Sequence, residues 1–355
     1  EPSPAEKLNG KVWDMLSSGL ALYSMSMASD LGVFQLMAGA RDPVSSTEIA
    51  AACSCSERFV EEMLRQLVAM GMLTRTPEGR YGMDDAQRAV LGDTSEANPF
   101  DAEPLFNYIP KVLAPRWGRH QEAFKTGRGL TYDENGPEAT AGIAKLTTGH
   151  AERLTRWLQS HDDVAAKLRS SAVVADIGCG SGNNLVHLAK TFPTSTFHGY
   201  DTSREALAAA KARAEAAGVA DRVVLHNPDE GGVLPNCPTF DVIYNVDVLH
   251  DMVDARPVIS AGRKAVKAGG KWFMVCVGGG GVLLCVMASG SLAPQVEPKA
   301  LDSVEENLAL PEAGLMYGFS CYMCLTSAMS EPSGPAVGAM GFTKAVAEDW
   351  FVAHG

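Results

Sequence analysis

The residues most suited to chemistry lie in a glycine-rich loop after an apolar run. Residues 173–177 are followed by glycines at alternate positions, in the pattern Asp-x-Gly-x-Gly-x-Gly formed by Asp176, Gly178, Gly180 and Gly182. Glycines at this spacing let the backbone approach a ligand closely and adopt positive φ angles. Such a loop between a strand and a helix predicts a ligand site at the carboxyl end of a parallel sheet.

The acid in this loop indicates the class of ligand. The dinucleotide fingerprint G-x-G-x-x-G needs a third glycine where Asn183 stands, and a pyrophosphate would be repelled by Asp176. A P-loop is excluded because no Gly-Lys-Ser/Thr follows. A cationic ligand, such as the amino acid and sulfonium end of S-adenosylmethionine (SAM), suits the carboxylate. An NAD-dependent oxidoreductase remains a disfavoured alternative.

Acidic residues also follow the next two apolar runs. Asp201 stands 23 residues after Gly178, where it could accept both ribose hydroxyls of a nucleoside, and Thr202 lies beside it. Asp229 follows the next run, where it could meet the adenine amino group. Each acid alone could be an ordinary loop residue, but three on successive strand ends outline an adenosyl ligand.

Alternating apolar runs and helical patterns predict the fold that positions these residues. The pattern after residue 171 is typical of a Rossmann-like parallel α/β sheet. We expect helices at 184–192 and 202–217, the second beginning with a Thr202/Glu205 capping box. We expect strands at 173–177, 196–200, 223–226, 241–245 and 271–277.

The amino-terminal region predicts a winged helix. A helix at 46–52 is followed by a turn, a second helix that ends at Gly71, and a small hairpin around 77–79. The second helix is net acidic and the whole chain has a formal charge of -12, so no nucleic-acid partner is expected. We interpret the module as a dimerisation or lid domain, and the apolar helices at 16–36 favour a homodimer.

The motifs together resemble those of the class I SAM-dependent methyltransferases. Residues 175–182 resemble motif I, 198–203 motif II and 240–251 motif IV, while 267–270 resemble the turn before strand 5. With the winged helix, the chain resembles the winged-helix class I methyltransferases of mycobacteria and their relatives. The resemblance implies three parts: a winged-helix domain at 1–95, a helical linker or lid at 96–170, and a SAM-binding domain at 171–355.

This resemblance also implies where the cofactor and a small-molecule substrate would bind. The implied reaction is methyl transfer, with O-methylation favoured over N- or C-methylation. The expected cofactor set adds two residues of motif IV, Asn245 and Asp247, to the acids and glycines above, and Asp247 could instead hold a polar group of the substrate. Tyr132 and Tyr317 are candidates to line the substrate cavity, although both also fit plain packing.

The candidate catalytic base is His250. It follows the fourth strand, and Leu249-His250-Asp251 is similar to the tract of small-molecule O-methyltransferases in which the histidine deprotonates a hydroxyl. Asp251 could orient His250 or raise its pKa. Simple packing is the competing interpretation for this histidine. A SAM-sensing or winged-helix regulatory protein without turnover is a further alternative.

The eight cysteines predict a reducing, cytoplasmic location because they form no disulfide framework. Cys321 and Cys324 have C-x-x-C spacing, but no second Cys or His pair accompanies them at zinc-finger distance. We therefore expect packed thiols and no metal site. No signal peptide is visible, and the uncharged stretch at 272–296 contains four consecutive glycines, so no membrane span is expected.

The carboxyl-terminal part departs from the family pattern. Residues 278–295 are rich in glycine and apolar residues, and from composition alone we hypothesise a non-native insertion, such as a retained intron. Only five strands can be counted, and a helix is expected at 345–354. We therefore predict that the antiparallel strands 6 and 7 of the class I sheet are missing and that the chain is a fragment.

Overall fold

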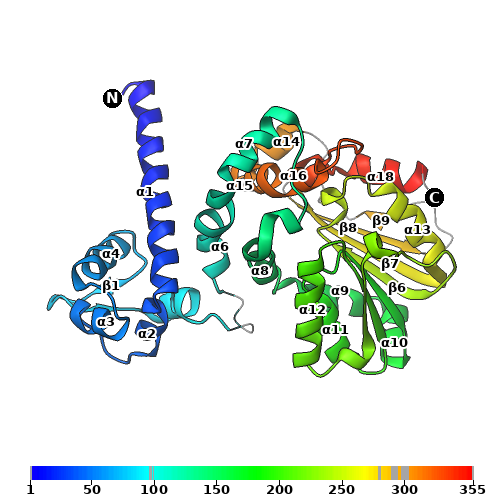
Figure 1. Ribbon diagram of the computed structural model, residues 1–355, viewed down its shortest axis with the longest axis horizontal. Coiled ribbons are helices and arrows are strands. Elements are labelled where there is room, and N and C mark those ends of the chain that lie inside the picture. Colours follow the sequence, from blue (N-terminus) through cyan, green and yellow to red (C-terminus); the bar gives the residue numbers. More distant parts are fainter. Residues whose placement is uncertain are drawn as a thin grey trace. The chain divides into compact units, whose positions relative to one another are not determined.

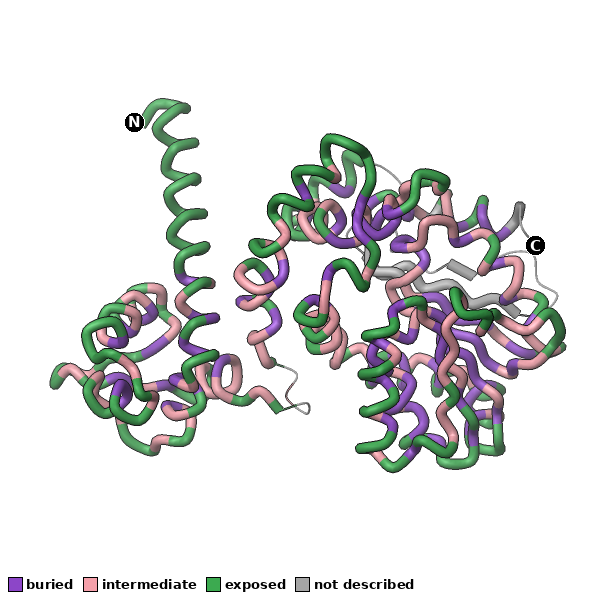
Figure 2. Tube along the Cα trace, viewed as in Figure 1, coloured by how far each residue is buried: buried purple, intermediate pink, exposed green. Residues whose placement is uncertain are grey.

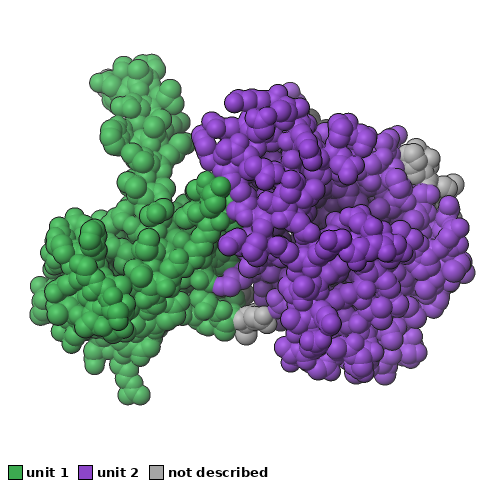
Figure 3. Space-filling model, viewed as in Figure 1, with its two compact units in different colours: residues 1–115 green, residues 116–355 purple. Residues whose placement is uncertain are grey.

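The computed structural model describes residues 2–95, 98, 100–278, 281–288, 295–296 and 304–353. The chain divides into two compact units, residues 1–115 and residues 116–355 (Figures 1 and 3). Among the described residues, no helix has both the length and the apolar character that crossing a bilayer requires.

The first unit is helical with one small hairpin. Two antiparallel strands, β1 and β2, follow the helix pair α3 and α4, which is the arrangement that the sequence predicts. Gly32, at φ 74°, separates the first two helices. The elements of this unit are α1 (Pro4–Asp30), α2 (Val33–Gly39), α3 (Ser46–Ala52), α4 (Glu57–Ala69), β1 (Thr74–Arg75), β2 (Tyr81–Gly82), α5 (Asp85–Gln87), η1 (Arg88–Gly92), α6 (Glu103–Asn107) and η2 (Tyr108–Leu113), with η3 (Ala114–Arg116) crossing into the second unit.

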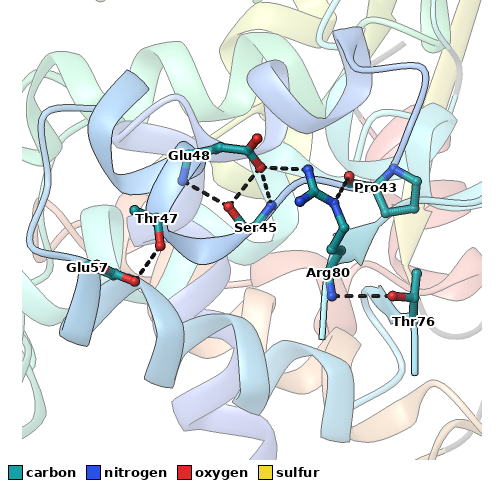
Figure 4. Close-up of polar contacts among 7 residues, drawn as sticks. All are labelled: Pro43, Ser45, Thr47, Glu48, Glu57, Thr76 and Arg80. Atoms are coloured by element: carbon teal, nitrogen blue, oxygen red, sulfur yellow. Dashed lines mark hydrogen bonds and ion pairs between the residues drawn. The ribbon is translucent and has the colours of Figure 1, made fainter. Parts of the chain in front are cut away.

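Polar contacts fasten the hairpin to the start of α3 (Figure 4). The side chain of Ser45 accepts a bond from the amide of Glu48 at 3.2 Å, and Glu48 accepts one from the amide of Ser45 at 2.8 Å. The Arg80 guanidinium donates to Glu48 at 2.7 Å and to the carbonyl of Pro43 at 2.7 Å. Arg80, one of the two arginines of the hairpin, therefore forms its contacts inside the module.

The cations of α4 are also paired within the module. Arg65 donates to Glu61 at 2.6 Å, and Arg58 donates to Glu62, both one helical turn apart. A helix that would enter the major groove needs cations available to phosphates. That the module binds no nucleic acid stays a prediction.

The second unit contains a seven-stranded sheet with helices on both faces. The strand order is β5-β4-β3-β6-β7-β8-β9, and the first five strands run parallel. The strands are β3 (Val173–Ile177), β4 (Thr196–Tyr200), β5 (Val223–His226), β6 (Phe240–Val246), β7 (Val266–Gly278), β8 (Gly281–Ala288) and β9 (Gln295–Val296). Because β3 pairs with β4 on one side and β6 on the other, the order reverses at β3, where ligands of open α/β sheets bind.

Alternate residues of the strands build two apolar layers. Phe240, Ile243 and Trp272 pack on one face, against the helix that carries Trp350. Val242 and Phe273 pack on the other face, with the helix that follows the glycine loop. Figure 2 shows the buried strands between these helical layers.

Helices precede the sheet, alternate with its strands and follow it. They are α7 (Trp117–Thr126), η4 (Asp133–Asn135), α8 (Gly136–Leu146), α9 (His150–Gln159), α10 (Asp162–Ser170), α11 (Asn183–Thr191), α12 (Arg204–Ala216), η5 (Ala220–Arg222), η6 (Pro228–Glu230), η7 (Leu249–Asp251), α13 (Arg256–Ala265), α14 (Val304–Leu308), α15 (Ala313–Phe319), η8 (Ser320–Cys324), α16 (Leu325–Ala328), α17 (Gly338–Gly341) and α18 (Lys344–Ala353).

The prediction that the two antiparallel strands are missing is wrong. β8 pairs antiparallel with β7 from Lys271↔Ala288 to Gly278↔Gly281, and β9 pairs antiparallel with β8. The strands at this edge come from 281–288 and 295–296, so the apolar stretch that suggested an insertion supplies part of the sheet. The rest of that stretch, 279–280 and 289–294, lies outside the described residues.

The cap of α12 also differs from the prediction. The N-cap lies one residue later than predicted: the side chain of Ser203, rather than that of Thr202, accepts a hydrogen bond from the amide of Ala206 at 3.1 Å. Asp133, which lies in η4, fixes this N-cap, because Ser203 Oγ donates to its carboxylate at 2.5 Å. Thr202 is therefore an exposed residue between the strand and the cap.

Candidate cofactor and active site

The glycine loop closes over the end of β4. Gly178, Gly180 and Gly182 have φ angles of 73°, 52° and 78°, a region that residues with a Cβ rarely adopt. The amides of Gly178 and Cys179 both donate to the carbonyl of Tyr200, at 2.7 and 3.1 Å. Gly182 is the residue before α11, so the loop delivers the chain directly into that helix.

The three glycines meet different surroundings. A Cβ on Gly178 would lie 2.2 Å from a methyl carbon of Val248, and one on Gly182 would lie 2.9 Å from the Cβ of Ala210. A Cβ on Gly180 would meet nothing within 4 Å. The outer glycines are thus needed for packing, and Gly180 borders the open space where a ligand could lie.

Asp201 ties the loop to the end of β4. Its two carboxylate oxygens accept the amides of Gly180 at 2.8 Å and of Ser203 at 2.9 Å. Burial raises the pKa of Asp201, the two amides oppose that rise, and Asp133 adds to it. Each oxygen of a carboxylate has a second lone pair, so Asp201 can still accept hydroxyl donors.

Asp176 is the more deeply buried acid. It is 1% exposed, and burial raises its pKa to about 8. The hydroxyl of Tyr244, from the paired position of β6, partly offsets this rise, whereas Asp201 adds to it. Within the described chain, neither Asp176 nor Asp201 forms an ion pair with a basic side chain. Two acids without a protein cation suit a positively charged ligand.

The predicted adenine contact Asp229 and the motif IV residue Asn245 lie in different surroundings. Asp229 lies in η6 after β5, where it is exposed, and its amide donates to the side chain of Asn227 at 2.9 Å. Asn245 is fully buried and accepts the indole N–H of Trp272 at 2.9 Å. Because Asp176 is paired with Tyr244 and successive strand residues alternate in direction, Asn245 faces the opposite side of the sheet from Asp176.

Asp247 stands at a special backbone position directly after β6. Its φ of 53° is in the left-handed region, and its amide donates to Val275 at 2.8 Å. A carboxylate oxygen lies 3.8 Å from Nδ1 of His150, a residue that the sequence did not indicate. Burial lowers the pKa of His150, although Asp247 opposes this shift. A backbone in this conformation after a strand is typical of functional sites.

The predicted catalytic pair is buried in η7. His250 is 3% exposed and Asp251 is 5% exposed, and Nε2 of the histidine lies 3.1 Å from Oδ1 of the aspartate. The hydroxyl of Tyr132 donates to the other oxygen of Asp251. Burial and the charge of Asp251 hold the pKa of Tyr132 well above its usual range, so the tyrosine stays a donor. Tyr317, on α15, is partly exposed and makes no described hydrogen bond to these residues.

The fold adds a neighbour to this pair that the sequence did not suggest. The thiol of Cys324, from η8, lies with ligand atoms of His250 and Asp251 so that all are within 4.8 Å of one another. Burial raises the pKa of the Cys324 thiol to about 11. The C-x-x-C spacing marked this cysteine, but only the fold shows that it meets residues more than seventy positions earlier.

Comparisons with known proteins agree with this geometry. Two family models match the chain, a methyltransferase domain over residues 175–272 and an O-methyltransferase dimerisation domain over residues 13–92. The chain therefore contains a methyltransferase domain and a dimerisation domain of the O-methyltransferase type. The first match contains the glycine loop and β6, and the second runs from residue 13, within α1, to the end of η1.

Several curated methyltransferases are similar to parts of the chain. The N-methyltransferase nanE of Aspergillus nanangensis is 24% identical over 233 residues, 58% of this chain and 56% of that protein. The 27-O-demethylrifamycin SV methyltransferase of Amycolatopsis mediterranei is 29% identical over 134 residues, 38% of this chain and 46% of that protein. The chain thus spans about half the length of the curated relatives it matches.

Solved structures share the whole fold. Human N-acetylserotonin methyltransferase in complex with SAM has a TM-score of 0.67 at 16% identity, over 100% of this chain and 93% of that chain. An O-methyltransferase family protein from Burkholderia thailandensis has a TM-score of 0.63 at 17% identity, over 93% of this chain and 88% of that one. These likenesses show the class I methyltransferase fold, including its antiparallel edge.

Proposed function

We propose that the protein transfers the methyl group of SAM to a small-molecule acceptor, with a hydroxyl oxygen as the favoured acceptor atom. The observation that carries the proposal is the pair of acids, the buried Asp176 and the partly buried Asp201, beside a glycine loop at the point where the strand order reverses. SAM supplies a methyl group on a positively charged sulfur when it is bound. A cation in this place would stabilise both carboxylates.

The residues present fit this cofactor. Gly180 borders open space, so the loop backbone can lie against the ligand. Asp201 would accept the ribose hydroxyls, with Thr202 beside it, and Asp229 would meet the adenine. Asp247 would hold the amino group of the cofactor. Asn245 faces the other side of the sheet and is left out of the proposed contacts.

The acceptor chemistry would depend on His250. Transfer to a hydroxyl needs a base within hydrogen-bond reach of the proton that leaves. With Nε2 turned to Asp251, Nδ1 is the nitrogen that would take the proton. The charge of Asp251 stabilises the protonated imidazole, and the bond from Tyr132 fixes the direction of Asp251. Tyr132 and Tyr317 would line the acceptor cavity.

The remaining parts of the proposal concern assembly and location. The first half of α1 is exposed and holds large apolar residues, including Trp13 at 64% and Met15 at 70% exposure, which a second copy of the chain would cover. We propose a homodimer built on residues 1–95, with 96–170 as a helical linker or lid and 171–355 as the catalytic domain. The six free thiols of the described residues favour a cytoplasmic location.

The first test is calorimetric binding of S-adenosylhomocysteine to the purified chain and to Asp201→Ala. Losing a charged acceptor of two hydroxyl bonds should weaken binding by about 2 kcal/mol, roughly thirtyfold. Asp221→Ala, at an exposed acid of η5, is the matched control and should bind normally. No binding by the unaltered chain would refute the proposal.

Turnover separates an enzyme from a SAM sensor. The chain should release S-adenosylhomocysteine when it is given SAM and a panel of phenols and other small hydroxylated acceptors. SAM binding without transfer to any acceptor, together with a DNA mobility shift, would favour the regulatory alternative instead. The internal pairing of Arg58, Arg65 and Arg80 counts against that result.

A further inference from the structure

We propose that His250, Asp251 and Cys324 form a binding site for a thiophilic divalent cation such as Zn²⁺, and that the bound ion inhibits the protein. One nitrogen, one oxygen and one sulfur ligand atom gather here within 4.8 Å of one another. The site was not expected from the sequence, because its ligands come from segments far apart in the chain.

The three side chains are positioned by separate elements that pack together. His250 and Asp251 lie in η7, and Cys324 ends η8, which leads directly into α16. α16 packs against η7 and so brings the cysteine to the pair. The hydroxyl of Tyr132 donates to one oxygen of Asp251, which leaves the other oxygen turned toward His250. The ligand atoms are thus preorganised before any ion arrives.

The ligand set selects the class of metal. Zn²⁺ is bound by thiolate, imidazole and carboxylate, commonly by three protein ligands plus a water. Mg²⁺ and Ca²⁺ prefer sets made only of oxygen atoms. A sulfur and a nitrogen among three ligands therefore favour Zn²⁺ or a similar thiophilic ion over either.

Binding would release a proton. The Cys324 thiol loses its proton to solvent as the sulfur–metal bond forms, and the imidazole binds in its neutral form. Burial keeps this thiol protonated in the absence of an ion. The apparent affinity for Zn²⁺ should therefore increase with pH.

Metal binding and inhibition depend on different observations. Metal binding needs only the three side chains, whereas inhibition rests on the proposed function, in which His250 takes the proton of the acceptor. A neutral imidazole carries one proton, so Zn²⁺ on Nε2, the nitrogen that faces Asp251, leaves that proton on Nδ1, and neither nitrogen can then take the proton of the acceptor. Binding must therefore be measured without cofactor or acceptor.

The experiment titrates Zn²⁺ into the reduced full chain in the presence of a chromophoric chelator, and repeats the titration with Cys324→Ser. Loss of a direct ligand should weaken binding at least about tenfold, because even the partners of metal ligands contribute that much. Cys321→Ser removes the neighbouring thiol of the same element and is the matched control, so it should bind as the unaltered chain does. Co²⁺ in place of Zn²⁺ should give a thiolate-to-metal absorption band that Cys324→Ser abolishes.

Each outcome decides one half. Equal Zn²⁺ affinity of Cys324→Ser and the unaltered chain, or a Co²⁺ spectrum without the thiolate band, would overturn the site. If Cys324→Ser fails to fold by circular dichroism, Asp251→Asn replaces it in the same titration. For inhibition, the ratio of methyl transfer rates with and without Zn²⁺ should fall for the unaltered chain and change much less for Cys324→Ser. Tight binding with an unchanged ratio would refute inhibition, while a chain inactive even with a chelator would count against the proposed function alone.

Discussion

At the scale of single residues, the ionised form of the buried acid Asp176 is more stable with a cation beside it than without one. Its pKa of about 8 lies above the ordinary value, because burial favours the neutral acid. Between the ordinary value and about 8 the folded chain keeps a proton that the unfolded chain has released. The free energy of unfolding of the cofactor-free chain therefore falls as the pH rises through this window.

This pH dependence of the free energy of unfolding gives a prediction for Asp176→Asn. The amide has no charge to bury, so the cofactor-free variant should be more stable than the unaltered chain at about pH 8, on the order of 1–3 kcal/mol. The difference should shrink toward about pH 5, where Asp176 is protonated in the folded state. Thermal melts at both pH values measure this, and a gain that does not depend on pH would show that the charge of Asp176 is not its cause.

His250 allows a prediction that separates catalysis from cofactor binding. His250→Gln keeps a polar side chain of similar size but cannot take a proton at neutral pH, so kcat should fall by about 10²–10⁴-fold. The calorimetric Kd for S-adenosylhomocysteine should stay the same, because this side chain lies beside Asp251 rather than in the glycine loop. A variant that keeps its kcat would assign His250 a packing role.

At the scale of elements, the loop between β3 and α11 couples two strand ends through packing. Gly178 lies against Val248, which follows β6, and Gly182 lies against Ala210 of α12. Gly180 touches neither. Substitutions along one short loop should therefore have separable effects on stability and on ligand binding.

The prediction compares two alanines. Gly178→Ala forces a Cβ to 2.2 Å from Val248 at a φ of 73°, so it should lower the free energy of unfolding by about 1–3 kcal/mol and weaken cofactor binding. Gly180→Ala meets open space and should cost only about 1 kcal/mol of stability for its positive φ, yet still weaken the cofactor complex. Urea unfolding and calorimetry measure the two effects, and equal losses of stability would contradict this account.

Short-range signals allowed much of the sheet to be predicted from the sequence. β3, β4 and β5 begin and end at the predicted residues, because each apolar run is bounded by turn residues or glycines. The cap of α12 was misplaced by one residue, since Thr202 and Ser203 are both good caps and Asp133, from a distant segment, holds Ser203. β8 was missed because its glycine-rich surroundings favoured an insertion over a strand.

Some of the site residues could be predicted from short-range signals, and others depend on contacts between segments that are far apart in the chain. Asp176 and Asp201 stand at strand ends that the sequence defines, so their meeting at the loop could be predicted. The contacts of Asp251 with Tyr132 and of Asp247 with His150 depend on how helices before the sheet pack on it. Periodicity gives no distance between such segments, and Cys324 was missed as a neighbour of His250 for this reason.

At the scale of the whole molecule, α1 has an exposed apolar face that the other elements of its own unit do not bury. Large apolar residues recur along its first half, and the dimerisation family model covers most of the helix. Leu8, Val12, Trp13, Met15, Leu16 and Leu20 are each at least 50% exposed. An apolar surface of this kind is typical of an interface between proteins.

The prediction is that Trp13→Glu dissociates the proposed homodimer. Placing a charge where an apolar surface would be buried leaves it without a partner, which is strongly unfavourable. Sedimentation or light scattering should show a dimer for the unaltered chain and a monomer for the variant. Asn9→Glu, a polar position of the same helix, is the control. A chain that is monomeric without any substitution would refute the dimer.

The hairpin of β7 and β8 has a consequence for the order in which the molecule folds. Parallel neighbours such as β3 and β4 can pair only across a long connection that includes a helix, whereas β8 pairs with β7, the strand that directly precedes it in the chain. Contacts between neighbours in the chain cost less loop-closure entropy and form faster than distant ones. The β7–β8 hairpin can therefore form independently of the glycine loop and of the parallel pairing around it.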